Sequence, residues 1–307
     1  MTLSTYWPRV MTTGRIEAGK WVAEYHMIPL IDGDVLAYAV GFSVQKPVYR
    51  VMLDGKVVGQ FNRVSERDDW VTSHQPEDIA RFEFGETGVS LEPIEHAYHN
   101  ANTTIAAIMS MTKAREYRIF LTGQGNFRET VATLAPYKGN RVQEKPVYLK
   151  AIREYLVEQH AAVVVDGEEA DDALGYTQMA APPNSTMIVS VDKDLHMIPG
   201  WHMHPQVLEP YQIHPDQALR CFYRQLLTGD RVDNILGCPR IGPKRAAALI
   251  TEDLGVADEV TMARIVLGEY SKHFDDPVAA MQENGRLLWI RRKPEEMWEI
   301  PNEALVS

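Results

Sequence analysis

Eight acidic residues stand in four short segments of this 307-residue chain. They are Asp32; Glu169, Asp171 and Asp172; Asp192 and Asp194; and Asp230 and Asp233. Carboxylates gathered at one place repel one another unless cations neutralise them. Hard cations such as Mg²⁺ and Mn²⁺ prefer oxygen ligands of this kind, and two ions about 4 Å apart can stabilise the attacking and leaving oxygens when a phosphodiester bond is cleaved. If the eight acids converge, they predict a divalent-metal site.

Three of the acidic segments follow short apolar runs that have the composition of buried strands. Residues 28–31 end at Asp32, residues 162–165 precede the second segment and residues 187–191 precede the third. In open α/β sheets the active crevice lies beyond the carboxyl ends of the strands. Any single acid at such a place is more often a helix cap or a solvated loop residue. The ordered set at successive strand ends favours convergence, and the i, i+3 spacing of Asp230 and Asp233 puts both on one face if that segment is helical.

Strands and helices are expected to alternate over residues 28–200. Strands at 28–31, 118–121, 162–165 and 187–191 are interleaved with helices at 95–115, 146–160 and 170–179. This alternation predicts an α/β fold with a mainly parallel sheet and helices on both faces. Residues 48–61 alternate around Asp54-Gly55, which predicts a hairpin, and residues 62–90 are expected to be irregular.

From His214 onward the pattern becomes helical, at residues 215–228, 243–252, 258–267 and 277–290. We therefore expect three regions, which are a poorly structured N-terminal leader over 1–27, a catalytic α/β domain over 28–205 with an insertion at 46–90, and a C-terminal helical domain over 206–307.

Two basic segments could contact phosphates. In the first, Lys138 would offset charge at a scissile phosphate, Arg141 would hold a neighbouring phosphate and Tyr137 would stack on a terminal base. A solvated basic turn is the alternative. In the second, Gly242 lets backbone amides approach a phosphate, and Lys244 and Arg245 add positive charge. Such a segment reads the DNA backbone and not the bases.

Together these segments resemble the 5′-nuclease superfamily, which includes phage 5′→3′ exonucleases, flap endonucleases and the 5′-nuclease domain of DNA polymerase I. The resemblance spans roughly residues 28–294. It rests on Asp32, Glu169-Ala-Asp-Asp172, Ser190-Val-Asp-Lys-Asp-Leu195, Gly229-Asp-Arg-Val-Asp-Asn234, Tyr137-Lys-Gly-Asn-Arg141 and Gly237-Cys-Pro-Arg-Ile-Gly-Pro-Lys-Arg245. One departure stands out, because the family usually has an aspartate after the strand at 118–121, where this chain reads Thr122-Gly-Gln-Gly125.

The resemblance implies a PIN-like catalytic sheet followed by a helix–three-turn–helix DNA-binding motif. It implies a hydrolase that uses two Mg²⁺ or Mn²⁺ ions and acts as an exonuclease or flap endonuclease in phage-type DNA replication. The implied substrates are DNA with a 5′ end, nick or flap, and RNA primers in RNA–DNA hybrids. Carbonyls of the turn before Pro243 are implied to hold K⁺. The alternatives are a catalytically weakened DNA-binding protein, motivated by the missing acid, and a ribonuclease of the related PIN group.

Composition sets further bounds. The net charge of −11 argues against a general DNA-coating protein, although the eight clustered acids supply most of it. The two cysteines suit neither a metal site nor a disulfide framework, and no apolar run is long enough to span a membrane. We expect a cytoplasmic protein, in a bacterial host if it is phage-encoded. His96, His99, His202 and His204 lack partners at ligand spacing and are not expected to bind metal.

Overall fold

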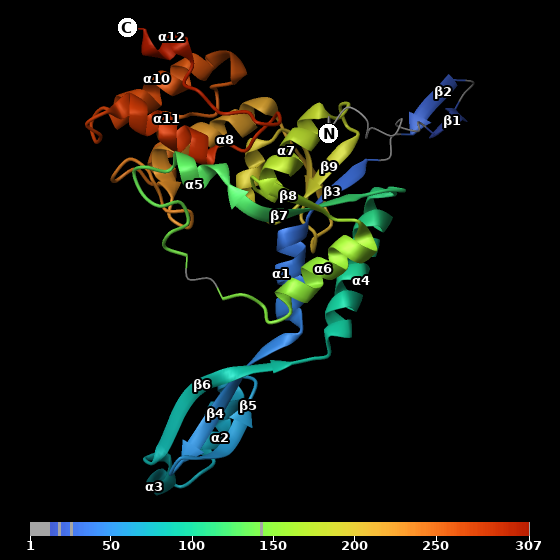
Figure 1. The fold of residues 1–307 in the computed structure, drawn as a ribbon, viewed down its shortest axis with the longest axis vertical. Coiled ribbons are helices and arrows are strands. Elements are labelled where there is room, and N and C mark those ends of the chain that lie inside the picture. Colours follow the sequence, from blue (N-terminus) through green and yellow to red (C-terminus); the bar gives the residue numbers. More distant parts are fainter. Residues whose placement is uncertain (1–12, 18–19, 25–26, 142–143, 307) are drawn as a thin grey trace. The chain divides into compact units, whose positions relative to one another are not determined.

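The structure is a computed structural model that describes residues 13–17, 20–24, 27–141 and 144–306 (Figure 1). Its elements in chain order are β1 Thr13–Glu17, β2 Lys20–Glu24, β3 Ile28–Asp32, α1 Gly33–Ser43, β4 Gln45–Leu53, β5 Lys56–Phe61, α2 Val64–Thr72, α3 Pro76–Ile79, β6 Phe82–Leu91, α4 Ile94–Thr112, β7 Arg118–Asn126, α5 Phe127–Val131, α6 Leu149–His160, β8 Val163–Gly167, α7 Ala170–Ala180, β9 Thr186–Val189, the 3₁₀ helix η2 Lys193–Met197, β10 Gly200–Met203, β11 Pro210–Ile213, α8 Pro215–Thr228, β12 Gly229–Asp230, β13 Ile235–Leu236, α9 Pro243–Leu249, the 3₁₀ helix η3 Val256–Asp258, α10 Glu259–Tyr270, α11 Pro277–Leu288 and α12 Asn302–Leu305.

The chain divides into two compact units, and the division differs from the expected domains. The larger unit contains residues 1–35, 104–143 and 156–307, and the smaller contains residues 36–103 and 144–155. The α/β sheet and the C-terminal helices therefore lie in one unit, without a division near residue 205. Among the described residues, no helix is both long and apolar enough to cross a membrane.

The larger unit is built on a six-stranded sheet with the strand order β11-β10-β9-β3-β7-β8. All neighbouring strands pair in parallel except β10 and β11, which are antiparallel. This confirms the predicted fold class, a mainly parallel sheet with helices. The order places β3, β7 and β9 side by side, so that the chain segments following these strands leave the sheet at the same edge.

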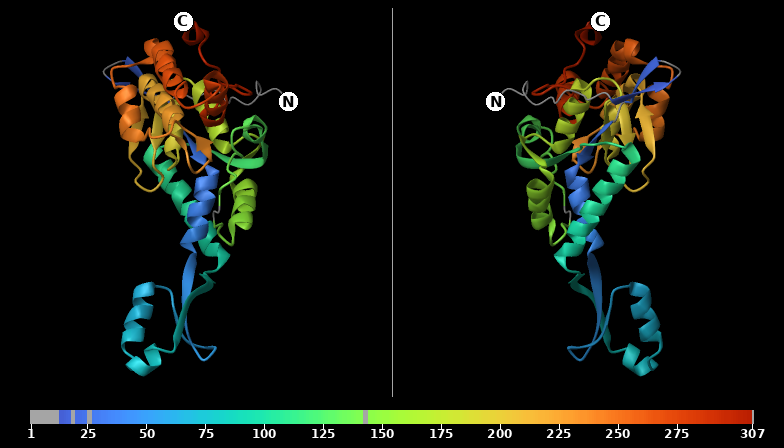
Figure 2. Two further views of the ribbon diagram at one scale, coloured as in Figure 1. Left: turned by 90° about the vertical axis from the view of Figure 1, so that its left-hand side faces the viewer. Right: turned by 90° about the vertical axis from the view of Figure 1, so that its right-hand side faces the viewer.

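Helix α7 packs across β7, β3, β9 and β8 and covers one face of the sheet (Figures 1 and 2). The contact is apolar, since Ala173 and Leu174 of α7 meet Leu30, Phe120 and Ile188 of the strands, all of them buried. Burial of such side chains contributes roughly 1.5 to 3 kcal/mol each. This packing fixes the N-terminus of α7, with its acids, at the edge where the strands end.

The C-terminal helices share a second apolar core, which includes Phe222 of α8, Val266 of α10 and Met281 of α11. Buried hydrogen bonds tie the helices together. The hydroxyl of Tyr270 in α10 donates to the Leu226 carbonyl in α8 at 2.8 Å, and Nδ2 of Asn284 in α11 donates to the Tyr270 hydroxyl at 2.9 Å. The four predicted helices of this region all appear, with ends that differ by up to three residues.

The smaller unit contains the predicted hairpin, formed by β4 and β5, and a third strand, β6, that pairs with β4. The prediction that residues 62–90 are irregular is wrong, because they contain α2, α3 and most of β6. These residues are ordered by tertiary contacts. Val71 of α2 and Phe82 of β6 are buried against Val51 of β4, and these contacts join residues that no local period connects.

Two strands also lie inside the segment that was expected to be an unstructured leader. β1 and β2 pair antiparallel, with Thr13 opposite Glu24 at one end and Glu17 opposite Lys20 at the other. Only two residues separate the strands, which is the commonest loop length in hairpins. Residues 1–12 lie outside the described part of the chain.

Candidate functional site

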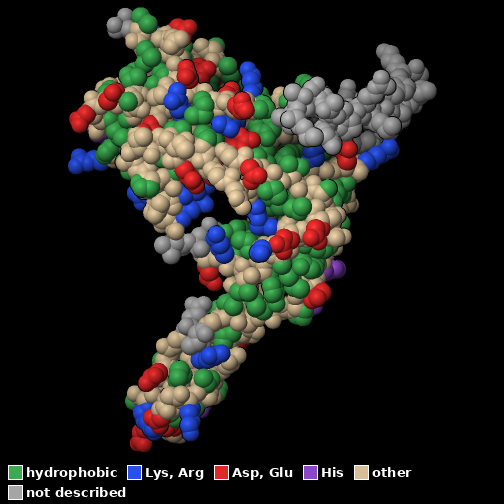
Figure 3. All heavy atoms as spheres, in the orientation of Figure 1, with side chains coloured by type: hydrophobic (Ala, Val, Ile, Leu, Met, Phe, Trp, Pro, Cys, Tyr) green, Lys and Arg blue, Asp and Glu red, His purple; other side chains and the backbone are tan. Residues whose placement is uncertain are grey.

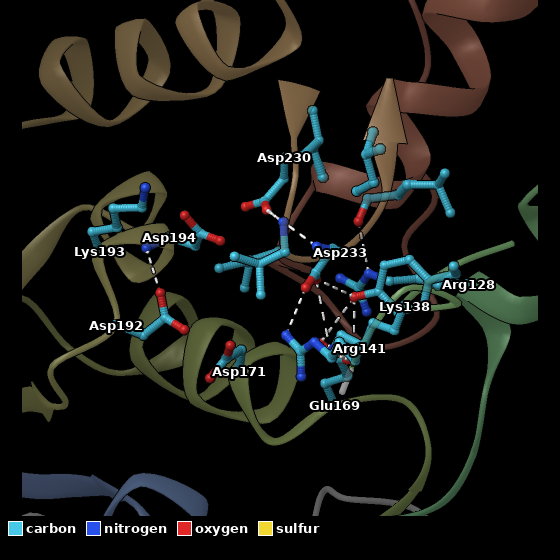
Figure 4. Close-up of a pocket in the computed structure, with 16 residues that line it drawn as sticks. Arg128, Lys138, Arg141, Glu169, Asp171, Asp192, Lys193, Asp194, Asp230 and Asp233 are labelled. Carbon is cyan, nitrogen blue, oxygen red and sulfur yellow. Dashed lines mark hydrogen bonds and ion pairs between the residues drawn. The ribbon is translucent and has the colours of Figure 1, made fainter. Parts of the chain in front are cut away.

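Six of the eight acids surround one pocket of about 260 Å³ in the larger unit. They are Glu169, Asp171, Asp192, Asp194, Asp230 and Asp233 (Figure 4). The same pocket is lined by Arg128, Tyr137, Lys138, Arg141 and Lys193. The structure therefore brings together the acidic segments and the first basic segment, which lie far apart in the sequence. Elsewhere on the visible face of the larger unit, acidic and basic side chains are interspersed (Figure 3).

Each pair of acids is positioned by the start of a helix or turn. Glu169 is the N-cap of α7 and Asp171 lies in its first turn. Asp192 is the N-cap of η2, and its Oδ1 accepts a hydrogen bond from the Asp194 amide at 2.8 Å. Asp230 and Asp233 do not share a helix face. Asp230 ends β12, and its Oδ1 accepts from the amides of Val232 at 2.7 Å and Asp233 at 3.2 Å.

Asp32, at the end of β3, does not line the pocket and has 4% of its surface exposed, but its charge acts on the pocket residue Asp171. The Ser190 hydroxyl donates to its Oδ2 at 2.7 Å and the Val35 amide donates to its Oδ1 at 3.0 Å. Burial, together with the charges of Asp34 and Asp192, raises the pKa of Asp32 to about 6. The site thus holds a carboxylate whose charge the protein does not fully compensate.

Two other acids show the same electrostatic strain. Burial and the charge of Asp32, followed by that of Asp192, raise the pKa of Asp171 well above its usual value. Burial and the charges of Asp192 and Asp230 raise the pKa of Asp194 to about 7. Within the described ranges, Asp32, Asp171, Asp192, Asp194 and Asp230 form no ion pair with a lysine or arginine.

The remaining two pocket acids, Glu169 and Asp233, are neutralised by the basic segment. Nζ of Lys138 bonds Oε1 of Glu169, and Nη2 of Arg141 lies 2.6 Å from Oδ1 of Asp233. The Tyr137 hydroxyl donates to Oδ2 of Asp233 at 2.8 Å. Burial and the nearby charge of Glu169 raise the pKa of Tyr137, so this phenol stays protonated and serves as a donor.

Asp172 is placed away from the pocket, although its sequence position suggested a metal ligand. Its carboxylate is fully buried and accepts two hydrogen bonds from the Arg128 guanidinium, at 2.6 and 2.9 Å. The Arg291 and Glu169 amides donate to the same carboxylate at 3.0 and 3.1 Å. Burial alone would raise the pKa of Asp172, but the charge and hydrogen bonds of Arg128 hold it below its usual value. The side chain acts as an internal anchor for the start of α7.

Several site residues were not assigned a role from the sequence. Ser190 opens a segment that carried the resemblance, so a signal for it existed, and Asn126 and Arg128 closely follow the Thr122-Gly-Gln-Gly125 segment, where the family's aspartate is missing. Asn126 donates to Oε1 of Glu169 at 2.8 Å. Gln225 of α8 had no local signal, yet its Nε2 bridges Oδ1 of Asp194 and Oδ2 of Asp230, each at 3.2 Å.

The end of β7, where the resemblance implied an acid, is crowded by acids from elsewhere. A Cβ added to Gly123 would lie 2.7 Å from the backbone carbonyl oxygen of Val165 and 2.1 Å from Oδ1 of Asp166, so a side chain does not fit there without a shift of the backbone. Oδ1 of Asp166 accepts from the Gln124 amide at 2.7 Å, and Oδ2 of Asp34 accepts from the Thr122 amide at 2.9 Å.

The second basic segment follows α8 in the larger unit. Gly237 is the glycine that packing requires, because a Cβ there would lie 2.2 Å from the backbone of Thr228, whereas Gly242 has open space around it. Gly242 is the N-cap of α9, whose first turn carries Lys244 and Arg245, both exposed.

Within the described residues, no three His, Cys, Asp or Glu side chains are close enough to form a ready-made metal site. The donor chemistry nevertheless suits hard cations, which prefer carboxylate oxygens. Five carboxylates in and beside the pocket form no ion pair with a described lysine or arginine, and the pKa values of three of them, Asp32, Asp171 and Asp194, are raised. Metal coordination here therefore requires adjustment of side-chain positions.

Comparison with known proteins gives two kinds of match, and no family model matches the chain. A 104-residue alignment covering 29% of this chain is 36% identical to a DNA polymerase I of Rhizobium leguminosarum. The alignment spans 10% of that polymerase.

Among solved structures, a bacteriophage T5 flap endonuclease in a pseudo-enzyme–product complex with DNA and metal ions aligns with a TM-score of 0.52 and 17% identity, covering 85% of this chain and 88% of the endonuclease. A T5 5′-exonuclease with bound zinc aligns over the same shares with a TM-score of 0.49 and 17% identity. The resemblance to 5′-nucleases indicated by the sequence motifs is thus confirmed, and the chain has the fold of the T5 flap endonuclease.

Proposed function

We propose that this protein is a divalent-metal-dependent 5′-nuclease that hydrolyses phosphodiester bonds of DNA, as a 5′→3′ exonuclease or a flap endonuclease. One observation carries the proposal, namely the pocket in which unpaired carboxylates face two basic side chains of one loop. A phosphate group bound there would meet Lys138 and Arg141 on one side and cation-binding oxygens on the other. The names of the similar proteins agree with this chemistry.

Two Mg²⁺ or Mn²⁺ ions fit the proposal best. The acids that form no ion pair within the described residues fall into two groups. The first is Asp32 at the end of β3 with Asp171 in the first turn of α7, and the second is Asp194 and Asp230, which share Gln225 of α8, with Asp192. We assign one ion to each group. Glu169 and Asp233 belong to neither group, because they pair with Lys138 and Arg141. When bound, the ions would activate a water molecule and stabilise charge on the phosphate oxygens. The buried Asp172 is left out of both groups.

The protein's own residues would bind and orient the substrate. Arg141, which pairs with Asp233, can pair with a phosphate instead and hold two of its oxygens with its guanidinium. Lys138, which pairs with Glu169, can instead offset the charge that develops on the phosphate in the transition state. The hydroxyl of Tyr137 donates to Asp233 and keeps its carboxylate oriented. We assign this role to Tyr137 in place of stacking on a terminal base. Duplex DNA would lie over α8 and α9, in the arrangement of a helix–three-turn–helix motif, with K⁺ at the carbonyls before Pro243.

A cleavage assay tests the proposal. Duplexes with a 5′ flap, a nick or a blunt 5′ end, and an RNA–DNA hybrid, would be labelled at the 5′ end and incubated with Mg²⁺, Mn²⁺ or EDTA. Metal-dependent release of short 5′ products supports the nuclease, and the preferred substrate separates exonuclease from flap cleavage and tests removal of RNA primers in replication. Binding of flapped DNA without cleavage in any metal would instead support a DNA-binding protein that has lost catalysis.

A further inference from the structure

Glu269, near the C-terminal end of α10, joins two exposed basic side chains. Its own side chain is 8% exposed, whereas those of Arg245 and Lys272 are 57% and 58% exposed. Nζ of Lys272 donates to Oε1 of Glu269 at 2.6 Å, and Nη2 of Arg245 lies 3.9 Å from Oε2. Oε2 is buried and accepts no hydrogen bond from any described residue. A carboxylate at this depth is costly unless cations stay near it, so Glu269 holds both bases close.

Glu269 and Lys272 lie near the turn that precedes α9. Burial and the charge of Glu269 raise the pKa of the Cys238 thiol to about 12, and Lys272 acts on that thiol in the opposite direction. Acid and amine therefore both lie near Cys238. The end of α10 is fixed to this turn, because Asn284 donates to the Leu236 carbonyl at 2.6 Å and to the Tyr270 hydroxyl at 2.9 Å.

Two cations held on one carboxylate retain donors for another anion. An arginine has five N–H groups and a lysine three, and Glu269 accepts one hydrogen bond, from Lys272. More than half of each basic side chain is open to solvent. Arg245 and Lys272 are separated along the chain but share Glu269 in space, so they present a double positive charge on one patch. A polyanion with regularly spaced charges complements such a patch.

We propose that Lys272 is a phosphate-binding residue, positioned with Arg245 by buried Glu269, and that the duplex-binding surface extends from α9 to the C-terminal end of α10. The inference rests on the proposed function, because it takes the polyanion to be duplex DNA. The inference adds Lys272 as a phosphate-binding side chain, and Lys272 lies outside both basic segments that the sequence singled out.

The test is equilibrium binding of duplex DNA, with EDTA present to prevent cleavage, as salt is raised from low to moderate concentration. Each phosphate that a variant no longer neutralises lowers the slope of log affinity against log salt by about 0.9. We expect this decrease for Lys272→Ala and for Arg245→Ala. The matched control is Arg264→Ala, which removes a positive charge from the middle of α10 but whose guanidinium donates to the Glu303 carbonyl at 2.6 Å. Its slope should equal that of the wild type.

A Lys272→Ala slope equal to that of Arg264→Ala overturns the inference and leaves the nuclease proposal standing. Absence of duplex binding by the wild-type protein overturns the proposed function itself.

The positioning role of Glu269 has a separate readout. In a Glu269→Gln background the effect of Lys272→Ala on the slope should shrink, since the amine is no longer held at the patch. An undiminished effect shows that Glu269 does not position Lys272. If Glu269→Gln fails to fold, the single variants at the exposed side chains still decide whether Lys272 contacts phosphate.

Discussion

The guanidinium of Arg128 and the carboxylate of Asp172 form a buried ion pair with two hydrogen bonds, of 2.6 and 2.9 Å. Arg128 also donates to the carbonyls of Leu287 and Trp289, at 2.8 and 2.9 Å. The pair therefore links α5, the N-terminus of α7 and the C-terminal end of α11. Since Glu169 and Asp171 lie at that N-terminus, the pair also fixes two of the pocket acids.

Asp172→Asn should destabilise the protein by about 3 to 5 kcal/mol, because it leaves the Arg128 charge buried without its partner. Asp171→Asn is the matched control. It removes a carboxylate whose pKa is raised by burial and by neighbouring acids, so stability should be unchanged or higher. Denaturant unfolding in EDTA measures both. Equal midpoints for the two variants would contradict the different roles assigned to neighbouring aspartates.

Lys138→Ala should lower turnover by orders of magnitude and change DNA affinity little. The reason is that a charge used mainly on the transition state affects kcat and not binding. Single-turnover cleavage and binding in EDTA give the two quantities. A loss of affinity as large as the loss of turnover would show that Lys138 only docks the DNA.

Asp230→Asn together with Asp233→Asn should remove one bound ion, preserve the fold and abolish most cleavage. Asp230 belongs to the unpaired group beside α8, and Asp233 orients the basic loop through Tyr137 and Arg141. Calorimetric titration with Mg²⁺ in the presence of DNA counts the ions. The same number of ions and the same cleavage rate in wild type and variant would refute the assignment.

Lys244→Ala together with Arg245→Ala should weaken duplex binding and flatten its salt dependence, by about 0.9 in the log–log slope for each phosphate left without a cation. Affinity measured at several salt concentrations gives the slope. If it does not change, the duplex binds at another surface.

The metal-free protein should lose stability as pH rises from about 4 to about 7. The folded-state pKa values of Asp32, about 6, and Asp194, about 7, lie above the usual value of 3.8, so in this range the folded state binds more protons than the unfolded state. Below that range the lowered pKa of Asp172 acts in the opposite direction, and its contribution is lost as pH falls. Thermal unfolding in EDTA at pH 5 and pH 7.5 tests this expectation. Asp194→Asn should reduce the difference, and an equal or larger difference in that variant would show that the Asp194 carboxylate is not its source.

The sequence by itself determined the α/β class, the helices after residue 214 and the grouping of six acids at one pocket. These are local properties, because apolar runs predict strands and the carboxyl ends of parallel strands share an edge. Which way each acid points was decided only by tertiary contacts. Asp171 and Asp172 are adjacent in one helical turn, yet one faces the pocket and the other a buried arginine from α5. Gln225 gained its partner Asp194, and Glu269 its partner Arg245, through helix packing. Residues 62–90 became ordered because Val71 and Phe82 are buried against β4. Such contacts join residues distant in sequence, so no local pattern records them.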